Sequence, residues 1–173
     1  MSDSGKPAEQ ILQLAKQAKK AARELAAVSG EVRAAALSAM VDALHNARSE
    51  LASANLADLE DARNAGLPQP MIARLEITDK VFDYMLKRLR EIAALPDPVG
   101  RTLEGFTRPN GFRVSKVTVP IGVIGIIYES RPNVTTDAAS VCLKSGNAVI
   151  LRGGSESLRT NIVLADAMAE AAS

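Results

Sequence analysis

Hydrophobic residues recur at spacings of three and four through the first hundred residues, which is the period of an amphipathic helix. Gly66, Pro68 and Pro70 are interpreted as the stop of one helix and as breakers beyond it. The pattern predicts four helices. The first ends at Ser29-Gly30, and the second begins at about Glu31. The third runs from about Ser49 to Ala65, and the fourth is capped by Thr78. The apolar positions are Ile11, Leu14, Ala18, Ala22, Leu25 and Ala26 in the first helix, Leu37, Met40, Val41 and Leu44 in the second, and Val81, Met85, Leu89 and Ile92 in the fourth.

The chain changes character near residue 100, where Val and Ile runs, glycines and turn signals replace the Ala-rich helical pattern. The stretches 102–107 and 112–119 flank the turn sequence at 108–111 and predict a β-hairpin. A two-stranded ribbon is marginally stable by itself. We therefore expect it to lie on this chain or on another copy.

Two short apolar runs, 123–127 and 148–151, predict strands that are covered on both faces of a parallel sheet. A helix between them ends at Gly146, and a last helix runs from Glu156 to about residue 172. The inward residues of the first of these helices are expected to be Val134, Ala138, Val141 and Cys142. A right-handed crossover makes the two strands parallel neighbours. Ligands of such sheets bind beyond the carboxyl ends of the strands, where the loops 128–133 and 152–156 lie.

Composition narrows the classes of function. Lys and Arg number 21 against 20 Asp and Glu, a net charge of +1, which argues against a nucleic-acid binder that works by neutralising phosphates. One Cys and one His exclude a disulfide framework and most zinc sites, and they argue against a Ser-His-Asp triad. Buried among apolar neighbours, Cys142 is expected to be a core thiol rather than a nucleophile. His45 is expected near a helix end, where a cation suits the helix dipole.

No targeting or membrane segment is evident. The first seven residues are polar, and the longest apolar stretch, 121–128, is far shorter than the roughly 20 residues that a membrane span needs. We therefore expect a soluble cytoplasmic protein with a reduced thiol.

The two loops at the expected strand ends carry the candidate chemistry. In the second, Gly153 and Gly154 let the backbone approach a ligand, and Arg152 adds a cation suited to a phosphate or a ribose edge. The following helix start offers free N–H groups. The other interpretation is a tight turn with Ser155 as the helix cap.

The first loop is a dense polar cluster. Arg131 is suited to clamp a carboxylate or phosphate, and Asn133 is suited either to donate to an oxyanion or to cap the helix. A simple ion pair between Glu129 and Arg131 is the competing interpretation.

The stretches PIGVIGIIYESRPNVT at 120–135 and LKSGNAVILRGGSE at 143–156 closely resemble γ-glutamyl phosphate reductases (glutamate-5-semialdehyde dehydrogenases), a branch of the aldehyde dehydrogenase superfamily. Other aldehyde dehydrogenases carry Pro-Trp-Asn in the first loop and Lys-Pro-Ser-Glu in the second. The resemblance spans essentially the whole chain. It implies an α/β, aldehyde dehydrogenase-like fold. Residues 1–100 would be the helical part of the NADP-binding domain, 101–119 an oligomerisation hairpin, and 120–173 the truncated start of a Rossmann-like NADP-binding core.

The resemblance also implies a reaction, the NADPH-dependent reduction of L-glutamyl 5-phosphate to glutamate 5-semialdehyde with release of phosphate, in proline biosynthesis. By position, Arg152 stands where relatives hold the cofactor ribose with a lysine. Ser155 and Glu156 stand near their ribose-contacting acid, in a cofactor loop that includes Gly153 and Gly154. Arg131 or Asn133 is the counterpart of the oxyanion asparagine. Expected partners are another copy of the chain, through the hairpin, and glutamate 5-kinase.

Family members are more than twice as long, and their catalytic cysteine lies in a second α/β domain. The sequence therefore indicates an N-terminal piece that is inactive by itself, with the nucleophile expected downstream. Two other interpretations stay open. One is a non-catalytic nucleotide-binding or oligomerisation module, and the other is a piece of a bifunctional pyrroline-5-carboxylate synthase.

Overall fold

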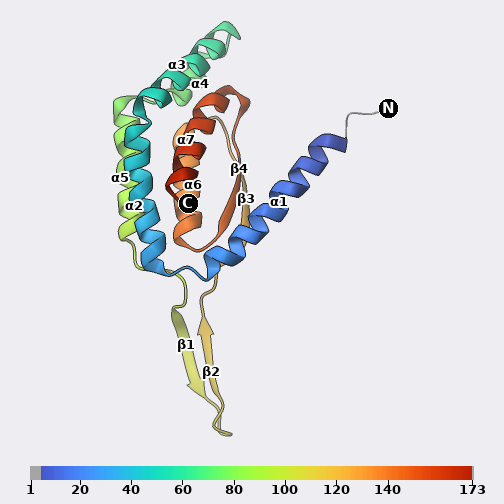
Figure 1. The fold of residues 1–173 in the computed structure, drawn as a ribbon. Helices are drawn as coiled ribbons and strands as arrows, with labels where there is room; N and C mark the ends of the chain where they lie inside the picture. Colours follow the sequence, from blue (N-terminus) through green and yellow to red (C-terminus); the bar gives the residue numbers. More distant parts are fainter. Residues whose placement is uncertain (1–4, 173) are drawn as a thin grey trace.

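A computed structural model describes residues 5–172 (Figure 1). The polar residues 1–4, which were part of the expectation of no targeting segment, lie outside them. The elements in chain order are α1 (Gly5–Ala26), α2 (Gly30–Asn46), α3 (Arg48–Asn64), α4 (Gln69–Leu75), α5 (Asp79–Ala94), β1 (Thr102–Thr107), β2 (Arg113–Val117), β3 (Val123–Ile127), α6 (Pro132–Lys144), β4 (Ala148–Arg152), the 3₁₀ helix η1 (Ser155–Ser157) and α7 (Leu158–Ala171).

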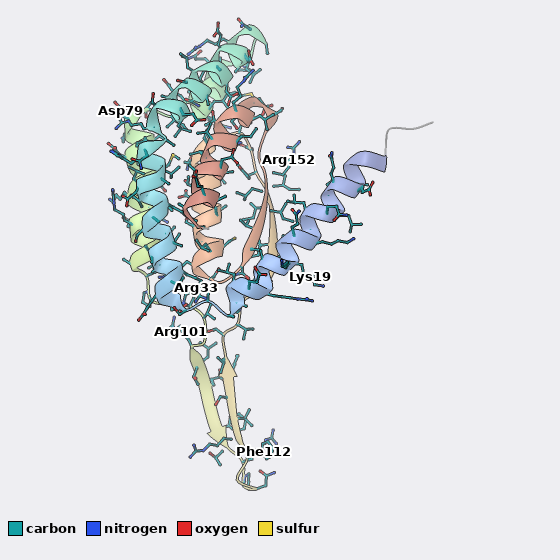
Figure 2. The ribbon with its side chains drawn as sticks, viewed as in Figure 1. Lys19, Arg33, Asp79, Arg101, Phe112 and Arg152 are labelled. Carbon is teal, nitrogen blue, oxygen red and sulfur yellow. The ribbon has the colours of Figure 1, made fainter. Side chains whose placement is uncertain are left out.

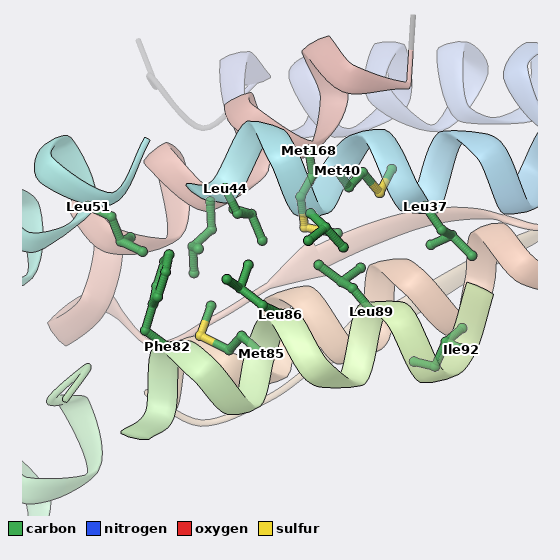
Figure 3. Packing of buried hydrophobic residues seen from close by; sticks show 12 residues of the cluster. Leu37, Met40, Leu44, Leu51, Phe82, Met85, Leu86, Leu89, Ile92 and Met168 are labelled. Atoms are coloured by element: carbon green, nitrogen blue, oxygen red, sulfur yellow. The ribbon is translucent and has the colours of Figure 1, made fainter. Parts of the chain in front are cut away.

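The main hydrophobic core lies between α2 and α5, with α7 closing it (Figure 3). The expected apolar positions of α2 are all buried, as are Met85, Leu89 and Ile92 of α5. The side chains of the two helices interdigitate, as close-packed cores require. Two caps fix the helix starts, because the Ser29 and Thr78 hydroxyls accept hydrogen bonds from the backbone N–H groups three residues later.

The first helix follows its predicted pattern only in its middle part. Ala18 and Ala22 are buried and Leu25 is half-buried, whereas Ile11, Leu14 and Ala26 are exposed. The buried part packs against β3 and β4.

Helix α4 is the element that the sequence interpretation lacked. Gly66 does end the turn after α3, with a φ of 72°. Pro68 and Pro70, however, stand at the start of the short helix α4 rather than in an irregular linker. Proline fits the first helical turn because the N–H that it lacks has no partner there in any case. Ile72 and Leu75 bury the inner face of α4 against Leu59 of α3.

The hairpin forms as predicted. Strands β1 and β2 pair antiparallel, and every residue of both is exposed. Figure 1 shows the ribbon projecting away from the helical body, so it rests on no other part of the described chain. Phe112 sits near its tip, and Arg101 lies at its base (Figure 2).

An ion pair between a buried arginine and a partly exposed aspartate holds the connector at the base of the hairpin. Arg33 is 2% exposed, and its Nη2 donates to both carboxylate oxygens of Asp97, at 2.7 and 2.8 Å. Its Nη1 donates to the Val28 carbonyl oxygen at 2.8 Å. Because hydrogen bonds between ionised groups are the strongest of their kind, Arg33 ties the connector before β1 to the first turn of α2.

Strands β3 and β4 pair in parallel, with Val123 opposite Ala148 and Ile127 opposite Arg152. Helix α6 packs on β4, and α1 contacts both strands, so the pair lies between them (Figure 1). The expectation of strands covered on both faces is met only in part, since the strand residues are half-buried and Ile127 is largely exposed.

Helix α6 departs from its predicted inner face. Cys142 is buried as expected, but Val141 is exposed. The buried positions also include the polar residues Thr135, Thr136 and Ser140, whose hydroxyl groups form hydrogen bonds. Because their hydroxyl groups are hydrogen-bonded, these polar residues can be buried, and a prediction from apolar positions alone does not find the inner face of α6.

Candidate functional site

A cavity of about 640 Å³ lies at the carboxyl ends of β3 and β4, the edge at which ligands of parallel sheets bind. Both predicted loops line it, and α4 forms the facing wall. The lining residues are Leu67, Met71, Arg74, Leu75, Ile127, Tyr128, Glu129, Ser130, Arg131, Arg152, Gly154, Ser155 and Glu156.

The two loops are bonded to each other. The Tyr128 N–H donates to the Arg152 carbonyl oxygen at 3.0 Å, which continues the strand pairing by one residue. Beyond it, the Ser130 hydroxyl donates to Glu156 Oε2 at 2.5 Å. This bond is the main reason that the pKa of Glu156 lies below its ordinary value. The carboxylate is therefore held ionised and in place on the floor of the site.

Gly153 and Gly154 make the contact between the loops possible. A β-carbon on Gly154 would overlap the Ser130 hydroxyl and lie 2.5 Å from Glu156 Oε2. One on Gly153 would lie 2.6 Å from Asn161 Nδ2 and 3.0 Å from the Tyr128 ring. Neither glycine has a positive φ. Within the described chain, the space beside both glycines is filled by the protein's own side chains.

Three arginines and two glutamates line the cavity. The side chains of Arg152 and Arg131 are exposed and form no hydrogen bond or ion pair within residues 5–172, and Figure 2 shows Arg152 at the end of the strands away from the hairpin. The third arginine, Arg74 of α4, lies 3.6 Å from Glu129. The expected pair between Glu129 and Arg131 is thus replaced by one that crosses the cavity. The surplus of positive charge suits an anionic ligand.

The helix caps that the sequence suggested in the two loops, Asn133 and Ser155, do not form. Pro132 is the first residue of α6, so the cap position falls on Arg131, which makes no side-chain cap bond. Ser155 lies in η1 and not at the cap of α7. Because proline is favoured in the first helical turn, α6 begins at Pro132, so Asn133 lies inside the helix and not at its cap position.

Asn133 lies apart from the other candidates. It does not line the cavity. Its side chain donates to Asp137 Oδ2 at 3.4 Å, one turn along α6. Burial raises the pKa of Asp137 above its ordinary value.

The single thiol behaves as a core group. Cys142 is buried on α6, and burial raises its pKa. His45 lies in the last turn of α2, as expected. Within residues 5–172 no group of His, Cys, Asp or Glu side chains is arranged to hold a metal ion, and no helix of this range has the length and apolarity to cross a membrane.

The α4 wall is the part of the site that the sequence did not indicate. Met71 and Arg74 were passed over because the two prolines that precede them, Pro68 and Pro70, were interpreted as breakers. The spacing of Ile72 and Leu75 was the available signal, since residues three apart share a helix face.

The fold and this site define the class. The sequence model of the aldehyde dehydrogenase family matches residues 4–173, so the chain belongs to that family. Within it, the chain is 47% identical over 93% of its length to the γ-glutamyl phosphate reductase of Thermodesulfovibrio yellowstonii and 52% identical over 91% to that of Solidesulfovibrio magneticus. It covers 38% of each of these proteins.

A solved structure gives the same result. The crystal structure of γ-glutamyl phosphate reductase from Thermotoga maritima superposes with a TM-score of 0.90 at 39% identity, over 92% of this chain and 39% of that one. The predicted aldehyde dehydrogenase-like fold and the predicted family resemblance are thereby confirmed.

Proposed function

We propose that this chain is part of an NADPH-dependent γ-glutamyl phosphate reductase, which reduces L-glutamyl 5-phosphate to L-glutamate 5-semialdehyde with release of phosphate. The observation that carries the proposal is the identity of about one half to enzymes of that name over nine-tenths of the chain. The cavity at the strand ends supports it, because it lies where this fold class binds nucleotides.

The residues at the cavity fit a phosphorylated dinucleotide. The Arg152 side chain forms no hydrogen bond or ion pair within the described chain and would hold a ribose phosphate. Ser155 and the ionised Glu156 would accept or donate to ribose hydroxyls. We assign Gly153 and Gly154 an indirect part, since they allow the loops to meet. The nicotinamide, when bound, supplies the hydride.

For the substrate we propose Arg131, whose guanidinium lines the cavity and is exposed to an incoming anion. Asn133 is a weaker candidate for an oxyanion donor because it lies outside the lining and is bonded to Asp137. We assign no nucleophile within residues 5–172, because the buried Cys142 has a raised pKa. The attacking thiolate is proposed to come from elsewhere in the protein.

The remaining proposals concern location and partners. We place the enzyme in the cytoplasm. The hairpin is proposed to pair with another copy of the chain, supported by its fully exposed strands and the exposed Phe106 and Phe112. A glutamate 5-kinase, which would make the acyl phosphate, is the proposed functional partner.

The test is a kinetic comparison in the full-length protein. In the reverse direction, glutamate 5-semialdehyde, phosphate and NADP⁺ should yield NADPH, which is followed by its absorbance. Arg152→Ala should raise the KM for the dinucleotide roughly tenfold or more, the value of one lost charged hydrogen bond, with kcat little changed. Arg90→Ala, a change of the same kind at another exposed position on α5, is the matched control.

Two results would overturn the proposal. An unchanged KM in Arg152→Ala removes the assignment of Arg152. No dinucleotide-dependent turnover in the wild-type protein removes the reductase. Nucleotide binding without turnover would favour the non-catalytic module, the second candidate, which rests on the lack of an assigned nucleophile within residues 5–172.

A further inference from the structure

Two polar residues are buried one helical turn apart on α3. Asn55 is 4% exposed and Asp58 is 3% exposed. Burying an amide and a carboxylate is costly unless each is hydrogen-bonded. The partners of these two side chains therefore show which parts of the molecule the inner face of α3 holds together.

Asp58 caps α7 from a distant element. Its Oδ2 accepts hydrogen bonds from the Thr160 backbone N–H at 2.9 Å and from the Thr160 hydroxyl at 2.7 Å. Its Oδ1 accepts a bond from Arg159 Nη1 at 3.1 Å. Thr160 is the third residue of α7, where the N–H has no partner inside the helix. The local cap residue, Ser157, makes no side-chain cap bond. The start of α7 is therefore placed by α3.

Asn55 holds the end of α4. Its Nδ2 donates to the Leu75 carbonyl oxygen at 2.8 Å, and its Oδ1 accepts a bond from the Ile77 N–H at 2.9 Å. The same Nδ2 lies 3.3 Å from the Thr160 hydroxyl oxygen. The Thr160 hydroxyl thus accepts from Asn55 while it donates to Asp58. One hydroxyl group connects α4 to α7 through α3.

Both held segments are walls of the cavity. Helix α4 carries Met71, Arg74 and Leu75, and η1, which leads into α7, carries Ser155 and Glu156. Figure 1 shows α3 and α4 together at the end of the molecule where α7 begins, and α3 contacts α4, η1 and α7.

We propose that Asn55, Asp58 and Thr160 are positioning residues that set the separation of the α4 wall from the η1 wall, and thereby the affinity of the cavity for the phosphorylated dinucleotide. The inference rests on the proposed function. None of the three lines the cavity. Their effect passes through Arg74 and Glu156, which both line it.

The test uses the full-length protein and three variants. Thr160→Val keeps the shape of the side chain and removes the connecting hydroxyl, whereas Thr160→Ser keeps the hydroxyl. Lys144→Met is the matched control, because Lys144 is a buried polar residue whose Nζ donates to the Ala93 carbonyl oxygen at 2.8 Å, away from the cavity lining.

In the reverse reaction, Thr160→Val should raise the KM for NADP⁺ at least fivefold and leave kcat within about twofold, since the chemistry is untouched. Thr160→Ser and Lys144→Met should keep the wild-type KM. This holds even if Lys144→Met lowers the free energy of unfolding. Equal KM values in Thr160→Val and wild type, or equal increases in Thr160→Val and Lys144→Met, would overturn the inference.

A second measurement needs no ligand. Amide hydrogen exchange in 69–75 and 152–157 should accelerate together in Thr160→Val, and in neither segment in Lys144→Met. Acceleration of one segment alone, or of neither, refutes the connection between the walls. If wild-type protein binds no NADPH, the proposed function fails, and the exchange result still decides whether the walls are coupled.

Discussion

Replacing Gly154 with alanine should destabilise the protein, although the backbone at this position is ordinary. Its φ is not positive, so alanine fits the local conformation. The added β-carbon would overlap the Ser130 hydroxyl and lie 3.1 Å from Ser130 Cβ. Ser130 must therefore rotate or shift, and its hydrogen bond to Glu156 is lost.

Three contributions set the magnitude. The lost bond to a charged group is worth about 1.5–3 kcal/mol. Forcing an extra methyl into filled space costs about 1–3 kcal/mol. The reduced freedom of the unfolded chain returns about 0.4–1 kcal/mol. The free energy of unfolding should fall by roughly 2–5 kcal/mol, a large share of the 5–15 kcal/mol of a typical domain.

Urea denaturation of the purified protein measures the change. Gly125→Ala is the control, since nothing lies within 4 Å of a β-carbon there and its φ is not positive. It should be neutral or slightly stabilising. Adding Ser130→Gly to Gly154→Ala should remove the overlap with the Ser130 side chain and recover part of the loss, without restoring the bond to Glu156.

Acid provides a further check with a definite sign. The pKa of Glu156 is depressed below its ordinary value of 4.5, mainly by the Ser130 bond. Such a group stabilises the fold above its unfolded pKa and loses that contribution as pH falls through its folded pKa. The difference between wild type and Gly154→Ala should therefore shrink below about pH 4.5. If Gly154→Ala proves as stable as Gly125→Ala at neutral pH, the packing role of the glycine is wrong.

Three further outcomes are expected. Cys142 should react with a thiol reagent at least tenfold more slowly in native protein than in urea, because burial removes access and raises its pKa; equal rates would contradict a core thiol. Arg33→Met should destabilise by about 2 kcal/mol at pH 7. Because the Val99 N–H and Arg33 hold the pKa of Asp97 below its ordinary value of 3.8, this loss should diminish as pH falls below about 4, and a denaturation series across pH checks the trend. Phe112→Ser should leave stability unchanged and weaken self-association in sedimentation velocity; unaltered association would remove the hairpin tip from the interface.

Much of the local structure was readable from residue spacing. The helices other than α4, the hairpin and the two parallel strands follow directly from apolar periods and turn residues. The failures share a cause. The predictions were wrong for the burial of Val141, for the cap at Asn133 and for helix α4. In each case proline or hydroxyl-bearing residues decide the local structure, and such residues occur both inside helices and in turns or caps.

The cavity was predictable only on one side. Loops that follow neighbouring parallel strands must emerge at the same edge, so the meeting of the loops 128–133 and 152–156 could be inferred from topology. The α4 wall could not be inferred from topology. Arg74 reaches the cavity because α4 packs on α3, and the order of the strands does not determine that packing.

The sequence by itself determined the elements other than α4, the parallel order of β3 and β4 and the family, because these depend on local periodicity and on contiguous motifs. Only the tertiary structure decided which side chains meet. It placed Asp58 at the start of α7, 102 residues further along the chain, and filled the space beside Gly154 with Ser130. Those contacts join residues far apart in sequence, whose proximity is set by the packing of whole helices and strands rather than by local propensity.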